Sequence, residues 1–315
     1  MKWLAGVWTA WVRLMSAREL GTSLARFRIA VGLVILYSLM SMIAGDMVEV
    51  MWVDAEYGGL IPTDTSHWLV SLLGGRTPTA AWTLVTSALA LATAMALGLG
   101  GRVTVFATLQ VYYALVTAGN TLTGGYDTLI TNALWLLVFA DSTATLSLDC
   151  RLRSKSWRSD RLVMAWPRYL LIAQLLVVYG CTGLYKLSPV WTPGGDLSAL
   201  YWVFQEPTWR RFDMTFTADF YWATQFMTGV TWWWEVLAPL MFLVYWFRYT
   251  ADRGGRLRTW VNRYDLRLPW AAVGVSLHLG ILVLLNVGPF SPISLAYYLC
   301  LIPPRAPKRE PAEAT

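Results

Sequence analysis

The sequence predicts an all-α, polytopic integral membrane protein, a helical bundle of about eight transmembrane helices with both termini in the cytoplasm. Three observations predict this class. Of the 315 residues, 56% are apolar and only 14% are charged, whereas soluble domains average about 25% charged. The mean hydropathy is +0.46, and the apolar residues gather in stretches of membrane-spanning length. The basic residues gather between alternate stretches. This composition excludes a soluble enzyme, a disordered chain and a nucleic-acid-binding domain.

Residues 1–19 predict an amphipathic helix lying in the membrane interface, because Trp3, Val7, Trp8 and Trp11 recur at helical spacing. A single transmembrane domain is expected over 20–303. The Pro-rich, charged segment 304–315 predicts a disordered cytoplasmic tail. The candidate spans are 24–44, 80–98, 103–119, 127–140, 168–187, 219–245, 269–286 and 288–303, of which the fourth and eighth are short.

The Lys and Arg residues support this count independently. With a cytoplasmic N-terminus, all 25 fall in inner loops or at inner span ends except Arg76, Lys186, Arg210 and Arg211. The first outer loop is acidic instead. Cytoplasmic loops of membrane proteins carry such an excess of Lys and Arg. The sequence therefore predicts a multi-pass protein of the cell inner (cytoplasmic) membrane with both ends inside.

Metal and disulfide chemistry are not expected. The chain has two histidines, His67 and His278, and three cysteines, Cys150, Cys181 and Cys300, without metal-ligand spacing or a CxxC pair.

The fifth span holds the most informative polar residues, because ionisable groups inside a membrane are expensive. Tyr179 and Lys186 lie two helical turns apart on one face, with Gly183 between them. A glycine there lets another helix or a ligand approach closely. Lys186 is either a snorkelling lysine that reaches the lipid headgroups or a partly desolvated amine that can act as a base.

Three further ionisable residues lie in other spans. His278 is either a hydrogen-bonded packing residue or a proton relay. Glu235 should be neutral, or paired with Arg28, Lys186 or His278. Arg26 fits an anchor at the inner interface, whereas Arg28, half a turn deeper, is expected to face the bundle.

Several of these segments, taken together in chain order, resemble one family. They are Leu24-Ala-Arg-Phe-Arg28-Ile-Ala-Val-Gly32, Ser147-Leu-Asp149, Gln174 to Leu187 with Trp191, Glu235 with Pro239, and His278 with Asn286-Val-Gly-Pro-Phe290-Ser. This set resembles bacterial HTTM-domain proteins, whose membrane domain is shared with vitamin K-dependent gamma-carboxylases. The resemblance runs from about residue 20 to 303. The domain also resembles the sporulation-delaying protein B family, so the superfamily does not imply one activity.

The resemblance implies a site that binds a quinone or hydroquinone. Lys186 resembles the carboxylase lysine that deprotonates vitamin K hydroquinone, and His278 resembles a histidine near that pocket. The remaining expected contacts to the bound molecule are Arg28, Tyr179, Gly183, Trp191 and Glu235. The carboxylase histidine early in the fourth span has no counterpart at 129–133, and the large C-terminal carboxylase domain has none in these 315 residues. Carboxylation of peptide glutamates is therefore not expected.

Three functions remain open, and the sequence does not decide whether the chain is an enzyme. The first is a quinone- or lipid-binding protein with carboxylase- or epoxidase-like base chemistry at the extracytoplasmic face. The second is a non-enzymatic subunit or scaffold of a larger membrane complex. The third is a transporter or a maturation factor, which the lack of an internal repeat disfavours. The expected partners are membrane lipids and other membrane proteins, and no nucleic acid.

Overall fold

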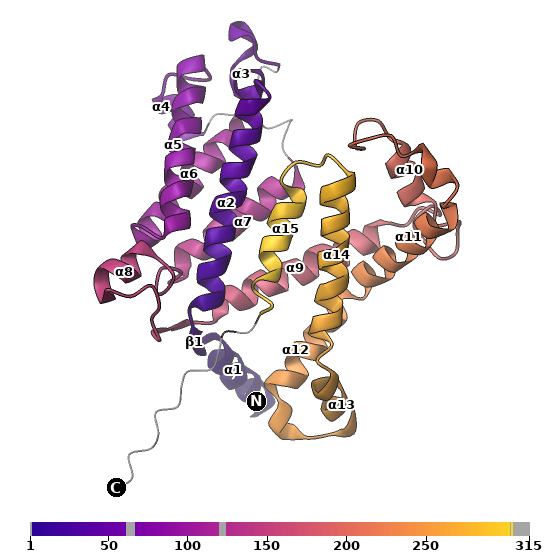
Figure 1. Ribbon diagram of the computed structural model, residues 1–315. Helices are drawn as coiled ribbons and strands as arrows, with labels where there is room; N and C mark the ends of the chain where they lie inside the picture. The colour runs from indigo at the N-terminus through magenta and orange to yellow at the C-terminus, as the bar shows by residue number, and fades with distance from the viewer. Residues whose placement is uncertain (1, 61–66, 120–123, 303, 305–315) are drawn as a thin grey trace. The chain divides into compact units, whose positions relative to one another are not determined.

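The computed structural model describes residues 2–60, 67–119, 124–302 and 304, and it is mostly helical (Figure 1). Two compact units are formed, the first by residues 1–171 with 302–315 and the second by residues 172–301. The predicted tail lies outside the described residues except for Pro304. The all-α, membrane-protein class is confirmed in its coarse form.

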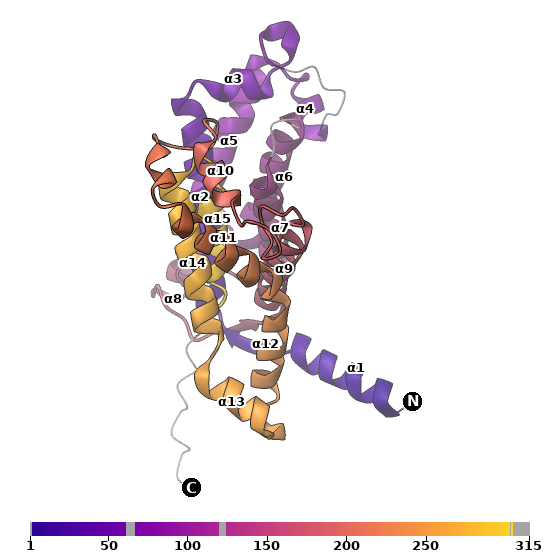
Figure 2. The same ribbon diagram turned by 90° about the vertical axis from the view of Figure 1, so that its right-hand side faces the viewer.

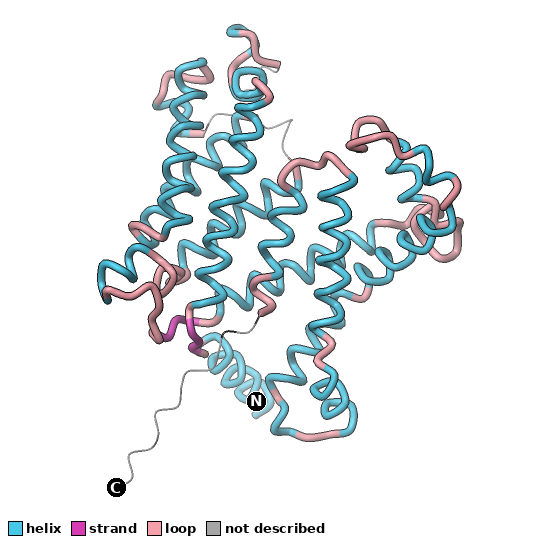
Figure 3. Tube along the Cα trace, in the orientation of Figure 1, coloured by secondary structure: helices cyan, strands magenta, loops and turns pink. Residues whose placement is uncertain are grey.

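The first unit begins with helix α1 (Lys2–Met15), in which Trp8 and Trp11 are exposed. Strand β1 (Arg18–Leu20) then pairs antiparallel with β2 (Leu162–Met164), as Figure 3 shows in magenta. The all-α expectation missed this pair, because three residues are too few to show a strand pattern. An ion pair of 2.6 Å between Glu19 and Arg168 links β1 to the first turns of α9 (Trp166–Tyr185).

The body of the first unit is a set of packed helices. Helix α5 packs against both α2 and α6 (Figure 2), and α7 packs against α6. Gly32 permits the contact between α2 and α5, because a Cβ there would lie 2.8 Å from the Cβ of Ala96. The elements are α2 (Thr22–Ala44), α3 (Met47–Trp52), η1 (Ala55–Tyr57), α4 (Trp68–Leu72), α5 (Pro78–Leu97), α6 (Gly101–Ala118), α7 (Gly125–Phe139) and α8 (Leu148–Ser154).

Arg28 holds the loop after α7 against α2. Its side chain is fully buried, and its guanidinium donates hydrogen bonds to the carbonyl of Leu146 at 2.7 Å and to that of Ser142 at 3.3 Å. Arg26 is exposed. The deeper arginine therefore faces the packed helices, as the sequence predicts.

The second unit contains α9 from residue 172 onward and nine further elements. Helices α14 and α15 lie side by side and run in opposite directions (Figure 1). The elements are α10 (Ala199–Gln205), η3 (Thr215–Ala218), α11 (Tyr221–Val236), η4 (Ala238–Leu240), α12 (Met241–Tyr249), η5 (Ala251–Arg253), α13 (Arg256–Tyr264), α14 (Arg267–Leu284) and α15 (Phe290–Tyr298).

Within the described residues, four helices are long and apolar enough to cross a membrane, namely α2, α5, α9 and α14. A fifth crossing results if α11 and the η4–α12 segment, which meet at an angle of 43°, form one span. Helix α7 has 15 residues and α15 has nine. Their lengths of about 22 Å and about 13 Å fall short of a hydrocarbon core of about 30 Å. The count of eight crossings therefore stays a prediction.

Because Arg28 is buried and Arg26 is exposed, we expect substitution of Arg28 to lower the free energy of unfolding much more than substitution of Arg26. Arg28→Met removes the donors for three backbone carbonyls, those of Ala96, Ser142 and Leu146, and hydrogen bonds to charged groups contribute about 1.5–3 kcal/mol each. We expect the free energy of unfolding in detergent to fall by about 2–4 kcal/mol. Arg26→Met is the matched control and should change the midpoint of thermal unfolding little. Equal shifts of the unfolding midpoint in the two variants would contradict the buried, hydrogen-bonded position of Arg28.

Candidate functional site

The site is centred on Lys186, one residue beyond the end of α9. Its Nζ lies 2.5 Å from Oε2 of Glu235, which α11 supplies. The lysine side chain is 19% exposed and that of Glu235 is 7% exposed. The amine is therefore bound to a carboxylate within the second unit, which is not the arrangement of a snorkelling lysine.

Two indoles complete the surroundings of Lys186. The ammonium lies 4.4 Å from the centre of the Trp191 ring, close enough for a cation–π attraction. Trp232 Nε1 donates a hydrogen bond of 3.2 Å to the backbone carbonyl of Lys186. The chain after α9 turns at Ser188–Trp191, where the Trp191 N–H donates to the Ser188 carbonyl at 2.9 Å. Lys186 is therefore held at its backbone and at its side chain.

Two glycines on one face of α9 let α11 approach closely enough for this ion pair. A Cβ at Gly183 would lie 2.7 Å from the backbone nitrogen of Val236 and 2.8 Å from the Cβ of Glu235. A Cβ at Gly180 would lie 2.7 Å from the ring of Pro239. Real Cβ atoms do not approach other heavy atoms so closely, so larger residues would force the two segments apart. This is the close approach that the sequence predicts at Gly183.

A second cluster lies deeper along α9, around Tyr179. The Tyr179 hydroxyl lies 2.6 Å from His278 Nε2, and the hydroxyl of Tyr298 donates to that of Tyr179 at 3.2 Å. Because Tyr179 accepts from Tyr298, its own proton is free to go to His278 Nε2. The imidazole proton then resides on Nδ1, an assignment made from the hydrogen-bond network.

The indole of Trp234 joins the two clusters. Trp234 precedes Glu235 on α11 and packs edge-on against the Tyr179 ring, with 4.4 Å between ring centres. It also stacks on Trp270 with ring centres 4.9 Å apart. A continuous line of contacts therefore runs from Lys186 through Glu235, Trp234 and Tyr179 to His278.

Three buried polar atoms of this region have no hydrogen-bond partner among the described residues, namely His278 Nδ1, Trp270 Nε1 and Ser291 Oγ. His278 and Ser291 are almost completely buried, and the Phe290 ring lies 5.4 Å from the imidazole. Buried polar groups in folded proteins are nearly always hydrogen-bonded, so each unpaired group calls for a partner. Here the indole and the imidazole offer N–H donors to a molecule with acceptor oxygens.

The structure thus brings together six of the seven residues that the sequence singled out, and places Arg28 in the first unit. The six are Lys186, Trp191, Glu235, Gly183, Tyr179 and His278. Arg28 hydrogen-bonds backbone carbonyls of its own unit. Among the described residues, no cluster of His, Cys, Asp and Glu suited to a metal ion is present.

Sequence reasoning missed three participants, Trp234, Trp270 and Tyr298. Trp234 lies in a run of three tryptophans at 232–234, whose side chains point in different directions. Trp232 contacts the Lys186 carbonyl, Trp233 is exposed and Trp234 is buried. Nothing in the sequence distinguishes Trp270 or Tyr298 from the aromatic residues that line membrane interfaces.

Comparison with known proteins gives one match. The family model described as the HTTM domain matches residues 18–244. The matched range includes Arg28 and the Lys186–Glu235 pair, whereas His278 and Tyr298 lie beyond it. Neither a curated protein nor a solved structure matches the chain.

We expect the substitution of glycine by alanine to have opposite effects on stability at Gly183 and at Gly280. Gly183→Ala places a methyl group against the α11 backbone and should lower the free energy of unfolding by about 1–3 kcal/mol. Gly280→Ala, on α14, is the control, because a Cβ there meets no atom within 4 Å. Alanine favours helix over glycine, so the control should raise stability by up to about 1 kcal/mol. Thermal unfolding in detergent measures both, and a stabilising Gly183→Ala would refute the close contact.

Proposed function

Because the chain belongs to the HTTM domain family, we propose that it binds a quinone, hydroquinone or related lipid and removes a proton from it. The observation that carries the proposal is the ion pair of Lys186 and Glu235 beside the Trp191 ring. In the proposed topology, the protein crosses the inner (cytoplasmic) membrane eight times and both termini lie in the cytoplasm. In that topology the end of α9, and with it Lys186, lies at the extracytoplasmic face.

The distribution of charge supports this topology. The shorter α6, α7 and α15 would supply the three crossings beyond the five that length and composition allow. The loop between α12 and α14 contains Arg253, Arg256, Arg258 and Arg263. Because cytoplasmic loops carry an excess of positive charge, these residues support a cytoplasmic position for this loop.

The donor set of the second unit fits a quinone. Trp270 Nε1 and His278 Nδ1 are buried nitrogens without a hydrogen-bond partner among the described residues, and both could donate to its oxygens. Lys186 offers a cation for a negatively charged oxygen, and Trp191 and Trp234 offer aromatic faces to an apolar ring. When bound in its reduced form, such a molecule supplies an acidic hydroxyl group and two electrons.

The side chains of Lys186 and Glu235 can carry out the proton transfer by themselves. The carboxylate takes one proton from the ammonium, which leaves a neutral amine beside a neutral acid. The amine then accepts a proton from a hydroxyl group held beside it, and this restores the ammonium. The Trp191 ring stabilises the positive charge that reappears.

His278 would then act as an orienting donor. Its Nε2 is engaged by Tyr179, which Tyr298 holds in turn. These contacts fix the tautomer and leave the Nδ1 proton free for a bound acceptor. The residues of this cluster position the molecule, whereas Lys186 and Glu235 exchange its proton.

A second candidate function is that of a non-enzymatic subunit of a membrane complex. It is favoured by the exposed aromatic side chains between α9 and the middle of α11, such as Tyr185, Trp202, Trp222 and Phe226. Large exposed apolar surfaces mark contacts with proteins or membranes. In this alternative, the ion pair of Lys186 serves only to clamp α9 to α11.

Substitutions of Lys186 distinguish the two candidates. Lys186→Arg keeps a cation beside Glu235 but replaces the amine with a group that does not give up its proton. We expect it to fold normally and to lower quinone-dependent turnover at least about 100-fold, since general acid–base catalysis contributes about 100- to 10,000-fold. Lys155→Arg is the matched control, because Lys155 is exposed in the first unit, and should leave turnover unchanged.

Full turnover in a folded Lys186→Arg variant would eliminate the proton-transfer proposal. If the purified chain shows no such turnover and copurifies with a membrane protein in a fixed ratio, the second candidate is favoured instead.

A further inference from the structure

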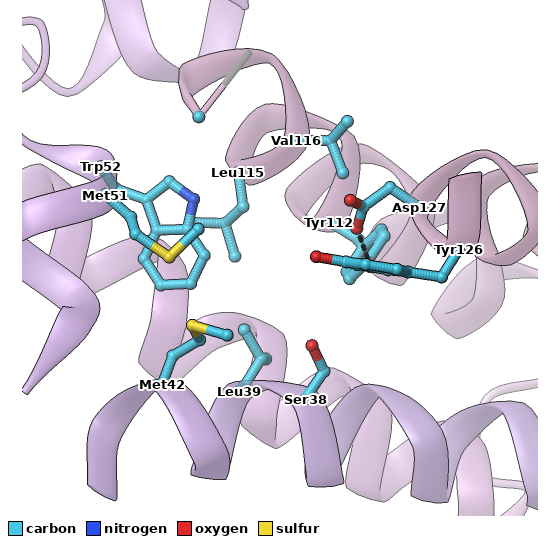
Figure 4. Close-up of a pocket in the computed structure, with 11 residues that line it drawn as sticks. Ser38, Leu39, Met42, Met51, Trp52, Tyr112, Leu115, Val116, Tyr126 and Asp127 are labelled. Carbon is cyan, nitrogen blue, oxygen red and sulfur yellow. Dashed lines mark hydrogen bonds between the residues drawn. The ribbon is translucent and has the colours of Figure 1, made fainter. Parts of the chain in front are cut away.

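A separate pocket lies in the first unit, between the ends of α2, α6 and α7 and the short helix α3 (Figure 4). Its volume is about 40 Å³. Asp127 and the aromatic residues Trp52, Tyr112 and Tyr126 are among the residues that line it. None of them belongs to the site around Lys186, and the following argument does not depend on the proposed function.

Asp127 gives this pocket an acidic side chain, and none of the cationic side chains among the described residues pairs with it. The residue is 9% exposed. Its Oδ1 accepts a hydrogen bond from the Tyr112 hydroxyl at 2.6 Å, and its Oδ2 accepts one from the Gly124 N–H at 2.9 Å. Among the described residues, no Lys, Arg or His forms an ion pair with it. The N-terminus of α7 compensates about half a charge.

The remaining lining suits a cation. Ser38 is 8% exposed, its hydroxyl has no hydrogen-bond partner among the described residues, and it points into the pocket (Figure 4). The Tyr126 hydroxyl also points toward the interior (Figure 4). The rings of Trp52 and Tyr112 offer aromatic surface, whose faces attract positive charge. Oxygen acceptors and aromatic rings therefore surround one small space.

The volume of the pocket favours a small cation. A cavity needs about 10–15 Å³ to hold one water molecule, so about 40 Å³ accommodates a primary ammonium group or about three to four waters. A quaternary ammonium, with four carbon substituents, is larger and has no N–H donor. A primary ammonium also carries three N–H donors for the carboxylate and hydroxyl oxygens.

The position of the pocket indicates where such an ammonium would come from. Ser38 and Met42 lie near the end of α2 at Ala44, and Tyr112 lies in the second half of α6. Tyr126 and Asp127 lie in the first turn of α7. Ends of membrane-crossing helices lie at the depth of the lipid headgroups. We propose that this pocket binds the headgroup amine of an ethanolamine phospholipid, with the Asp127 carboxylate as its counter-ion.

Lipid retention tests the proposal. The purified full chain is equilibrated with vesicles of equal parts phosphatidylethanolamine and phosphatidylglycerol, and native mass spectrometry then measures the lipids that remain bound. We expect wild type to prefer the ethanolamine lipid about tenfold or more, since hydrogen bonds to charged groups contribute at least about one factor of ten. Asp127→Asn should abolish this preference. Asp141→Asn is the matched control, because that acid, whose side chain is 28% exposed, pairs with Arg161, and should retain it.

Two further variants separate binding from folding, because Asp127 also caps α7. Ser38→Ala and Tyr126→Phe remove single hydroxyl groups that take no part in the cap, and each should weaken the preference several-fold without altering the thermal unfolding midpoint. Free ethanolamine should compete with the bound lipid, and phosphatidylcholine should not replace it.

Equal retention of the two lipids by wild type would overturn the proposal, as would an unchanged preference in a folded Asp127→Asn variant. Protection by free ethanolamine without any retained ethanolamine lipid would show that the pocket takes a soluble amine, and would overturn the lipid assignment.

Discussion

The organisation of the second unit depends on one interaction, the ion pair between Lys186 and Glu235. A carboxylate in an apolar segment, such as that of Glu235 in the last turn of α11, is costly unless a cation meets it. Glycines at 180 and 183 let α11 and η4 come close enough for that contact. Trp191 covers the amine, and Trp234 extends the contacts to Tyr179 and His278. Breaking a buried pair of this kind costs about 3–5 kcal/mol.

The sequence predicts those features in which a single residue is costly to bury or is unusually small. Ionisable residues in apolar stretches identified Lys186, Glu235, His278 and Arg28, because a membrane tolerates such groups only when they are engaged. The smallness of Gly183 indicated a close approach. The different depths of Arg26 and Arg28 predicted which of them is buried, as observed.

The sequence does not predict which helices contact one another. Arg28, Lys186 and His278 were equally plausible partners for Glu235, because spacing along the chain does not say which helices meet. The packed aromatic residues Trp270 and Tyr298 have no pattern that sets them apart from interfacial ones. The last apolar stretch is 16 residues long, at 288–303, and the helix within it has nine residues. Gly288 and Pro289 precede it, and a turn ends it after Tyr298.

A double-mutant cycle on the ion pair tests the account most directly. Lys186→Met, Glu235→Gln and the double variant are compared with wild type by unfolding in detergent. Because each single change leaves the other charge buried and unpaired, the account predicts that the double variant loses less stability than the two singles added together. The difference should be about 1–3 kcal/mol. Losses that add to within about 0.5 kcal/mol would show that the amine and the carboxylate do not interact, and would contradict the account.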